Sequence, residues 1–190
     1  MAILAAKFRV KNKGIFDLKG LYEYLHLWVC EEGFGPFDDK EFPEVFHGQT
    51  EFPDGSKELW IWWRCRKIPD NNSYYCYELD IDWHSVPFKN TEIVYQGKKV
   101  KVVQGDLEIN VEVRIVPDYK GTWSKHWLLK HFKNFYWKVI HKSDFELRKK
   151  DMREFAYRLQ ETIKDFWELQ PGAEEPEHEG NFWPQEGIGE

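Results

Sequence analysis

Cysteines, long apolar runs and catalytic signatures are all scarce in this sequence. It has three cysteines, Cys30, Cys65 and Cys76, without CxxC spacing, which argues against both a disulfide framework and a zinc site. No apolar run approaches the length needed to cross a membrane, and the first residues lack the basic segment of a signal peptide. These absences predict a protein of the reducing cytoplasm.

Short motifs of nucleotide binding and hydrolysis are missing as well. The sequence contains no GxGxxG, phosphate-binding loop, GxSxG or HExxH, the patterns that hold phosphates, a nucleophilic serine or a zinc ion. We therefore predict no catalytic residue and no cofactor, and we favour a binding protein over an enzyme. A Ser/His/Asp triad brought together by the fold stays open, because such a triad needs no local motif.

Aromatic residues, by contrast, make up 17% of the chain and include 10 tryptophans. Rings in such number must pack in a core or serve a ligand, a partner or a membrane surface. A chain of 190 residues is long enough to bury about 70% of its surface around a single core. We predict one domain over residues 1–170, followed by a tail.

The middle of the chain predicts an antiparallel sheet. Residues 59–66 and 75–84 are rich in aromatic and β-branched side chains and flank a loop of turn formers, as the two strands of a hairpin do. The short turns that follow imply further antiparallel neighbours. These later strands and turns are predicted at 91–95, Gln96-Gly97, 98–102, Gly105-Asp106 and 107–115.

The first two strands also predict a register. Pairing Leu59 with Trp83 gives one apolar face and places Arg64 opposite Glu78 on the other face. A slip by one residue would set Arg64 beside Leu79 and remove that charge pair. The other predicted pairs are Ile61 with Ile81, Trp63 with Leu79, Cys65 with Tyr77, Trp62 with Asp80 and Trp60 with Asp82.

Further strands and helices are predicted on either side of this sheet. Residues 2–11 and 44–51 are predicted as strands, and Asp17 is predicted to cap a helix that ends near Gly33. Two apolar stripes between residues 122 and 169 are out of phase. They predict two C-terminal helices, or one helix kinked near 141–143, with Ser143 opening a capping box.

Together these elements predict an α+β fold. Its sheet is an antiparallel meander of about five to seven strands. One N-terminal helix and two C-terminal helices, or one kinked helix, cover one face of that sheet.

The last segment, residues 171–190, differs in composition from the rest. It holds six glutamates and no Lys or Arg, so its charge equals the -6 of the whole chain, and residues 1–170 are formally neutral. Such a composition predicts disorder, interrupted by an aromatic clip formed by Phe182 and Trp183. We expect this clip to dock in a groove of its own chain or of a neighbour.

Asp80, Asp82 and His84 share one face of a predicted strand and are weak candidates for a metal site or for acid-base groups. Three side chains on a straight strand span too far to converge on one ion. The competing interpretation is a solvated face balanced by Arg64 and Arg66. We favour that interpretation and predict no metal.

A basic stretch runs from residue 125 to residue 142 without an acidic side chain. Its lysines interleave with tryptophans, a pattern found in helices that bind anionic membranes or nucleic acid. The competing interpretation is a solvated lysine face above a buried aromatic stripe. The lysines concerned are Lys125, Lys130, Lys133, Lys138 and Lys142.

These features favour a non-enzymatic cytoplasmic protein that binds or assembles through protein-protein contacts, most simply with itself. Trp60 and Trp62 motivate this expectation, because they fall on the more polar face of the predicted sheet and need cover. The aromatic clip, Phe182 and Trp183, needs cover in the same way. Attachment to a membrane surface or to nucleic acid through residues 125–142 is one alternative.

The order of elements suggests another alternative. A strand, a helix, an antiparallel meander and C-terminal helices resemble the START-like helix-grip arrangement, in which a curved sheet wraps a long C-terminal helix around an apolar cavity. The likeness lies in element order and composition, so it implies no particular site residue in this chain. It implies a carrier of a hydrophobic small molecule that binds between sheet and helices.

Overall fold

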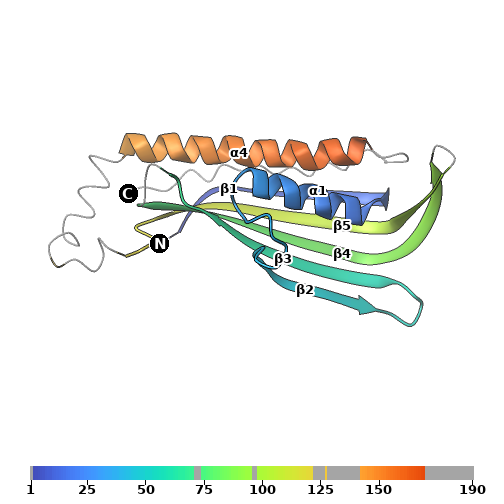
Figure 1. Cartoon of the computed structure of the whole chain (residues 1–190). Coiled ribbons are helices and arrows are strands. Elements are labelled where there is room, and N and C mark those ends of the chain that lie inside the picture. The colour runs from blue at the N-terminus through green and yellow to red at the C-terminus, as the bar shows by residue number, and fades with distance from the viewer. Residues whose placement is uncertain (1, 71–73, 96–97, 122–126, 128–141, 170–190) are drawn as a thin grey trace.

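The computed structural model describes residues 2–70, 74–95, 98–121, 127 and 142–169. Within these residues the chain forms one five-stranded antiparallel sheet and two helices. Both helices lie on the same side of the sheet (Figure 1). The α+β class with an antiparallel sheet is therefore confirmed. Most of the first predicted C-terminal helix, and the acidic tail, lie outside the described residues.

Four strands follow one another as a meander, and the first strand of the chain joins at the far edge. The order across the sheet is β1-β5-β4-β3-β2, so β2 to β5 are consecutive neighbours and β1 pairs with β5. The strands are β1 Ile3–Phe16, β2 Glu44–Glu51, β3 Lys57–Lys67, β4 Tyr75–Tyr95 and β5 Lys98–Pro117.

The register between β3 and β4 differs by two residues from the one we predicted. A shift of two keeps every side chain on its predicted face, so the alternation cannot distinguish the two registers. In the observed register Arg64 faces Asp80. Arg66 likewise faces Glu78, so a second opposite-charge pair is gained. The other observed pairs are Trp60 with His84, Ile61 with Trp83, Trp62 with Asp82, Trp63 with Ile81 and Cys65 with Leu79.

The predicted turn at Gly105-Asp106 is wrong, because β5 runs through this point without a break. The four strands predicted between residues 75 and 115 are therefore two long ones, β4 and β5. Their pairing changes beside Gly105: Ser85 pairs with Leu107, but the next pair joins Lys89 to Gln104. One more residue lies in β4 than in β5 between these pairs, which is a β-bulge.

Gly105 lets β4 come close at this bulge. A Cβ atom at residue 105 would lie 2.6 Å from the carbonyl oxygen of Pro87 and 2.7 Å from the Cβ of Phe88, so only glycine fits without a shift. Beyond the bulge both strands curve toward the side of the sheet that carries the helices (Figure 1). We call this curved part, residues 89–95 and 98–104, the distal arm.

Helix α1, Leu18–Glu31, begins and ends where the sequence predicts. The side chain of Asp17 accepts a hydrogen bond of 2.9 Å from the backbone N–H of Gly20, which confirms the predicted N-cap. At the other end Gly33 has a φ of 78°. The N–H of Phe34 donates to the carbonyl of Val29 and that of Gly33 to Cys30, which forms a Schellman motif.

Helix α4, Lys142–Glu168, carries the second predicted apolar stripe. It begins before Ser143, so Ser143 lies inside the first turn and not at the cap we predicted. The stripe faces inward, mainly over β1 and β5, and Arg158 binds Glu32 at the end of α1 through both carboxylate oxygens. The buried residues of the stripe are Phe145, Met152, Ala156, Leu159 and Ile163.

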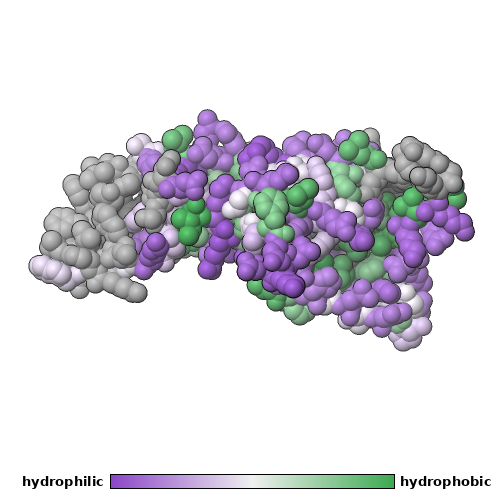
Figure 2. Space-filling model, in the orientation of Figure 1, coloured by the Kyte–Doolittle hydropathy of each residue, from purple (hydrophilic) through white to green (hydrophobic). Residues whose placement is uncertain are grey.

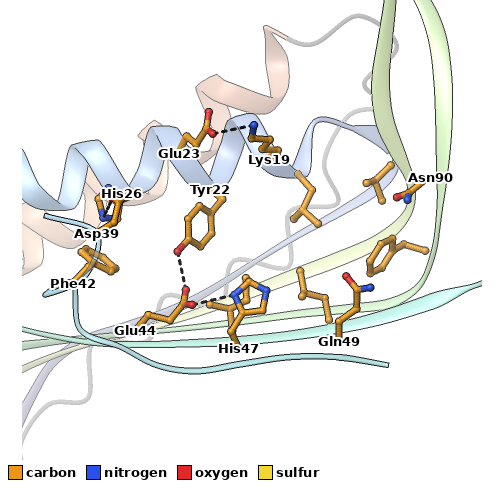
Figure 3. Close-up of a pocket in the computed structure, with 15 residues that line it drawn as sticks. Lys19, Tyr22, Glu23, His26, Asp39, Phe42, Glu44, His47, Gln49 and Asn90 are labelled. Atoms are coloured by element: carbon orange, nitrogen blue, oxygen red, sulfur yellow. Dashed lines mark hydrogen bonds and ion pairs between the residues drawn. The ribbon is translucent and has the colours of Figure 1, made fainter. Parts of the chain in front are cut away.

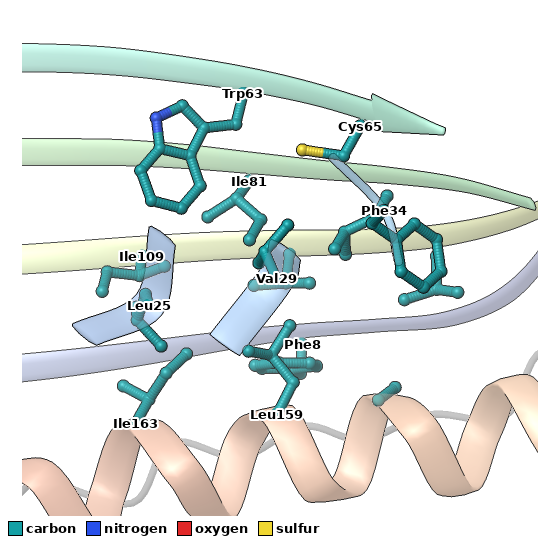
Figure 4. Close-up of a cluster of buried hydrophobic side chains, with 14 of the residues drawn as sticks. Phe8, Leu25, Val29, Phe34, Trp63, Cys65, Ile81, Ile109, Leu159 and Ile163 are labelled. Carbon is teal, nitrogen blue, oxygen red and sulfur yellow. The ribbon is translucent and has the colours of Figure 1, made fainter. Parts of the chain in front are cut away.

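The hydrophobic core fills the space between the sheet and the two helices. Phe8 of β1, Leu25 of α1 and Leu159 of α4 meet there over Ile81 of β4 (Figure 4). Trp63 and Trp83 are buried in the same layer. The opposite face of the sheet carries charged and aromatic side chains, and we call it the open face.

The core predicts a clear difference between two leucines of α4. Leu159 is fully buried, whereas Leu147 is exposed. Leu159→Ala should lower the free energy of unfolding by about 2–5 kcal/mol, because it removes buried methyl groups and leaves a cavity. Leu147→Ala should change it by less than about 0.5 kcal/mol. Urea denaturation measures both values, and equal losses would contradict this packing of α4.

Candidate functional site

A pocket with a volume of about 620 Å³ lies between α1 and the β2 side of the sheet. The space-filling view shows hydrophobic residues in a recess below α1, with hydrophilic residues beside them (Figure 2). The residues that line the pocket come from α1 (Leu18, Lys19, Tyr22, Glu23, His26), the loop after it (Asp39, Phe42), β2 (Glu44, His47, Gln49), β3 (Leu59, Ile61), β4 (Phe88, Asn90) and β5 (Val103).

The carboxylate of Glu44 is the centre of the polar part of this pocket. Its Oε2 accepts hydrogen bonds from the hydroxyl of Tyr22 at 2.8 Å and from the indole N–H of Trp63 at 3.0 Å. Its Oε1 lies 3.0 Å from Nδ1 of His47 (Figure 3). Because a carboxylate only accepts, Nδ1 carries the proton in this contact. One side chain therefore ties α1, β2 and β3 together.

A β-bulge places Glu44 and His47 on the same side of β2. Residues three apart on a regular strand point to opposite faces. The pairing with β3 shifts between Glu44 and Phe46, so Val45 is the additional residue and His47 joins Glu44 at the pocket. The sequence does not predict this pair, because nothing in the alternation of residues 44–51 signals the bulge.

The phenol of Tyr22 is held in its protonated form. Burial raises its pKa first, and the hydrogen bond to Glu44 and the nearby negative charges of Glu44 and Asp39 raise it further. Ionisation would place a second negative charge beside Glu44. The hydroxyl therefore acts as a donor that fixes the position of the carboxylate.

A second polar pair lies at the Phe42 end of the pocket. The imidazole of His26 packs on the ring of Phe42, with 4.1 Å between the ring centroids. Its Nε2 lies 3.7 Å from Oδ1 of Asp39. Near the start of α1, Lys19 and Glu23 form an ion pair of 3.5 Å along the helix surface.

The rest of the wall is apolar. Leu59 and Ile61 form the floor from β3, and Leu18 contributes from the first turn of α1. Phe88 and Val103 come from the bulge and the distal arm. The curvature of β4 and β5 therefore completes the pocket on the side away from Phe42.

The predicted metal candidates lie on the open face and do not converge. Asp80 is bound by Arg114 and lies 3.8 Å from Arg64. His84 contacts Glu58 at 3.1 Å and stacks on Trp60 with 3.5 Å between centroids. Asp82 likewise pairs with Arg64. Among the described residues no group of three or more His, Cys, Asp or Glu side chains is arranged to hold a metal ion.

The predicted interface residues that can be placed also lie on the open face. Trp60 is 36% and Trp62 is 37% exposed. Trp62 packs against Phe46 of β2 with 4.6 Å between ring centroids, so part of its cover comes from its own chain. The other two, Phe182 and Trp183, lie outside the described residues.

Of the predicted basic surface, the structure describes only the last lysine. Lys142 opens α4, whereas Lys125, Lys130, Lys133 and Lys138 lie outside the described residues. In the part of the chain that the structure describes, no helix is long and apolar enough to cross a membrane.

The three cysteines are free and buried. Burial raises the pKa of the Cys65 thiol to about 12. A thiol needs a lowered pKa to act as a nucleophile near neutral pH. Cys65 is therefore a packing residue of β3.

Comparisons of the chain with protein-family models, with curated proteins and with solved structures found no match. No solved structure therefore adds to the START-like resemblance in element order. Any function of the pocket has to follow from its own geometry.

Two tyrosines of α1 test the polar cluster. Tyr22→Phe removes a donor to a half-buried carboxylate and should lower the free energy of unfolding by about 1 kcal/mol at neutral pH. Because the pKa of Tyr22 is raised in the folded chain, its contribution is complete below the unfolded pKa of about 10 and falls as the pH rises above it. The difference between wild type and variant should therefore shrink in alkaline solution.

Tyr24→Phe is the matched control, because Tyr24 lies on the same helix and is exposed. It should leave the free energy of unfolding within about 0.5 kcal/mol of the wild-type value. Urea denaturation at several pH values measures both variants. A Tyr22→Phe effect that is no larger than the control, or that grows at high pH, would rule out the proposed role of Tyr22.

Proposed function

We propose that this chain binds a small molecule with an apolar body in the pocket between α1 and β2, as a cytoplasmic carrier or sensor. The pocket volume of about 620 Å³ carries this proposal. It falls within the range of about 300–1,000 Å³ that is usual for small-molecule sites. An apolar wall with a few convergent polar groups is also the usual chemistry of such sites.

One polar group of the pocket, the carboxylate of Glu44, is held in place by contacts within the chain. Tyr22, Trp63 and His47 hold the two oxygens of Glu44 from three different elements. A preorganised group loses little conformational freedom when a ligand binds. This arrangement supports recognition of a polar group on the ligand, while the leucine and isoleucine floor accepts its apolar part.

Binding fits these residues better than turnover. Of the described residues that line the pocket, none is a serine, threonine or cysteine, so neither an aliphatic hydroxyl nor a thiol is offered as a nucleophile. The raised pKa of Tyr22 keeps its proton in place, and Glu44 is already engaged by three donors. We therefore propose a carrier or sensor and no reaction.

Two neighbouring residues of β2 test this proposal. Gln49 lines the pocket, whereas Thr50 points to the other face of the strand. The wild-type chain should bind a neutral apolar dye such as Nile red at a saturable site. Gln49→Trp should weaken that binding by at least about tenfold, because the indole fills the pocket, and Thr50→Trp should leave it unchanged.

Fluorescence titration of the three proteins measures these affinities. Gln49 and Thr50 are both exposed side chains of β2, so neither substitution should impair folding. Circular dichroism checks that both variants fold. Nile red binding that is not saturable in the wild type, or that is equally strong in Gln49→Trp, would refute a ligand site between α1 and β2.

Self-association is a second candidate function, favoured by the aromatic patch of the open face. This patch consists of Phe46, Trp60 and Trp62, all still partly exposed. It lies next to the outer edge of β2, where among the described residues no other strand pairs. Antiparallel pairing of β2 with the β2 of a second copy, about a two-fold axis, would place both patches on one face of a continuous sheet.

A charge introduced into the patch tests this second candidate. Phe46→Lys should convert a dimer into a monomer in sedimentation velocity experiments, because lysine on an edge strand opposes pairing. Phe52→Lys is the control, since Phe52 is similarly exposed but lies outside β2. A wild-type protein that stays monomeric over a wide range of concentrations would exclude the dimer.

A further inference from the structure

We propose that the ligand is an organic cation, an amine or ammonium group on an apolar body, with its charged head beside Glu44. This inference rests on the proposed function and names the class of ligand. It follows from the charges that line the pocket, from the donors around Glu44 and from the aromatic rings at the same end.

The pocket carries more negative than positive charge. Three carboxylates and one ammonium group line it, those of Glu23, Asp39, Glu44 and Lys19. Lys19 is paired with Glu23. In the described part of the chain, the ion-pair partners of Asp39 and Glu44 are histidines, His26 at 3.7 Å and His47 at 3.0 Å. Among the described residues, neither carboxylate has a lysine or arginine within ion-pair distance.

The donors that hold Glu44 leave its charge uncompensated. Tyr22 and Trp63 donate from a neutral hydroxyl and a neutral indole, both to Oε2. They fix the carboxylate without cancelling its charge, and His47 adds a positive charge only when it is protonated. The Glu44 side chain is 22% exposed, so a cation that enters the pocket meets this charge in surroundings less polar than water, where the attraction is stronger.

Aromatic rings lie at the same end of the pocket as Glu44. Tyr22 and Phe42 both line it, and the close-up shows them beside Glu44 and away from Asn90 (Figure 3). Aromatic rings attract cations through the negative charge of their faces, which is how proteins recognise ammonium ligands. The apolar body of the ligand then lies toward Leu59, Phe88 and Val103.

A ligand of the opposite charge would be rejected. A carboxylate head at the same place would meet Glu44 and Asp39, both negative. The ammonium group in the pocket, that of Lys19, is already paired with Glu23. An anion would therefore have to break this ion pair and overcome repulsion from two carboxylates.

Three ligands that share the same alkyl chain and differ in the charge of the head group test this inference. Octylamine, octanol and octanoate should displace Nile red from the wild-type chain in that order of strength at neutral pH. Octylamine should bind about tenfold more tightly than octanol, and octanoate more weakly than either. In Glu44→Gln the preference for the amine should disappear, and in Glu51→Gln, on the same strand but outside the pocket, it should persist.

The outcomes separate this inference from the proposed function. Equal displacement by all three ligands, or stronger displacement by octanoate, would overturn the cation and leave the pocket proposal intact. An absence of saturable Nile red binding would refute the pocket proposal itself. An amine preference that survives in Glu44→Gln would overturn the role of Glu44.

Asp39→Asn covers the case in which Glu44→Gln fails to fold. The Asp39 side chain is 93% exposed, so its replacement should not disturb packing. This variant should bind octylamine more weakly relative to octanol than the wild type does. The preference should also fall as ionic strength rises, because exposed charges are screened. A preference for octylamine over octanol that changes neither in Asp39→Asn nor with ionic strength would overturn the inference.

Discussion

The close approach of β4 and β5 at Gly105 is the constraint on which the rest of this structure depends. One additional residue in β4 and a glycine without a side chain in β5 let the strands pass the bulge and curve together. Before the bulge, the two strands supply the floor of the core under α1 and α4. Beyond it, the distal arm turns toward the helices and becomes one wall of the pocket. A straight pair of strands would leave α1 without this wall and the pocket open at its apolar end.

A second irregularity, the bulge at Val45, shapes the other side of the pocket. It turns Glu44 and His47 toward α1 together, and Glu44 then joins the helix to β2 and β3 through Tyr22 and Trp63. The same contacts have a structural and a chemical consequence. They hold the edge strand against the helix, and they keep a charged carboxylate beside an apolar recess. The proposal for a cationic head group follows from this position of Glu44.

Sequence patterns predicted the regular parts of the fold and missed the irregular ones, for identifiable reasons. Alternation fixed which face of β3 and β4 is buried, because a side chain's face depends only on odd or even position. The same property hid the register error, since a shift of two preserves both faces. Asp17 and Gly33 were predicted correctly because caps are local chemistry. Gly105 looked like a turn because a glycine in a bulge and a glycine in a turn have the same sequence signature. Glu44 and His47 could not be predicted as a pair without the bulge at Val45.

A native mass spectrum of the full-length protein tests the central claim, that the pocket between α1 and β2 holds a small molecule, most directly. The protein should be purified gently at low salt and measured before and after incubation with Nile red, octanol and octylamine. We expect an additional mass of one ligand per chain, present in the wild type and in Thr50→Trp, lost on denaturation and reduced in Gln49→Trp. A bare chain mass as purified and after incubation with all three compounds would contradict the account.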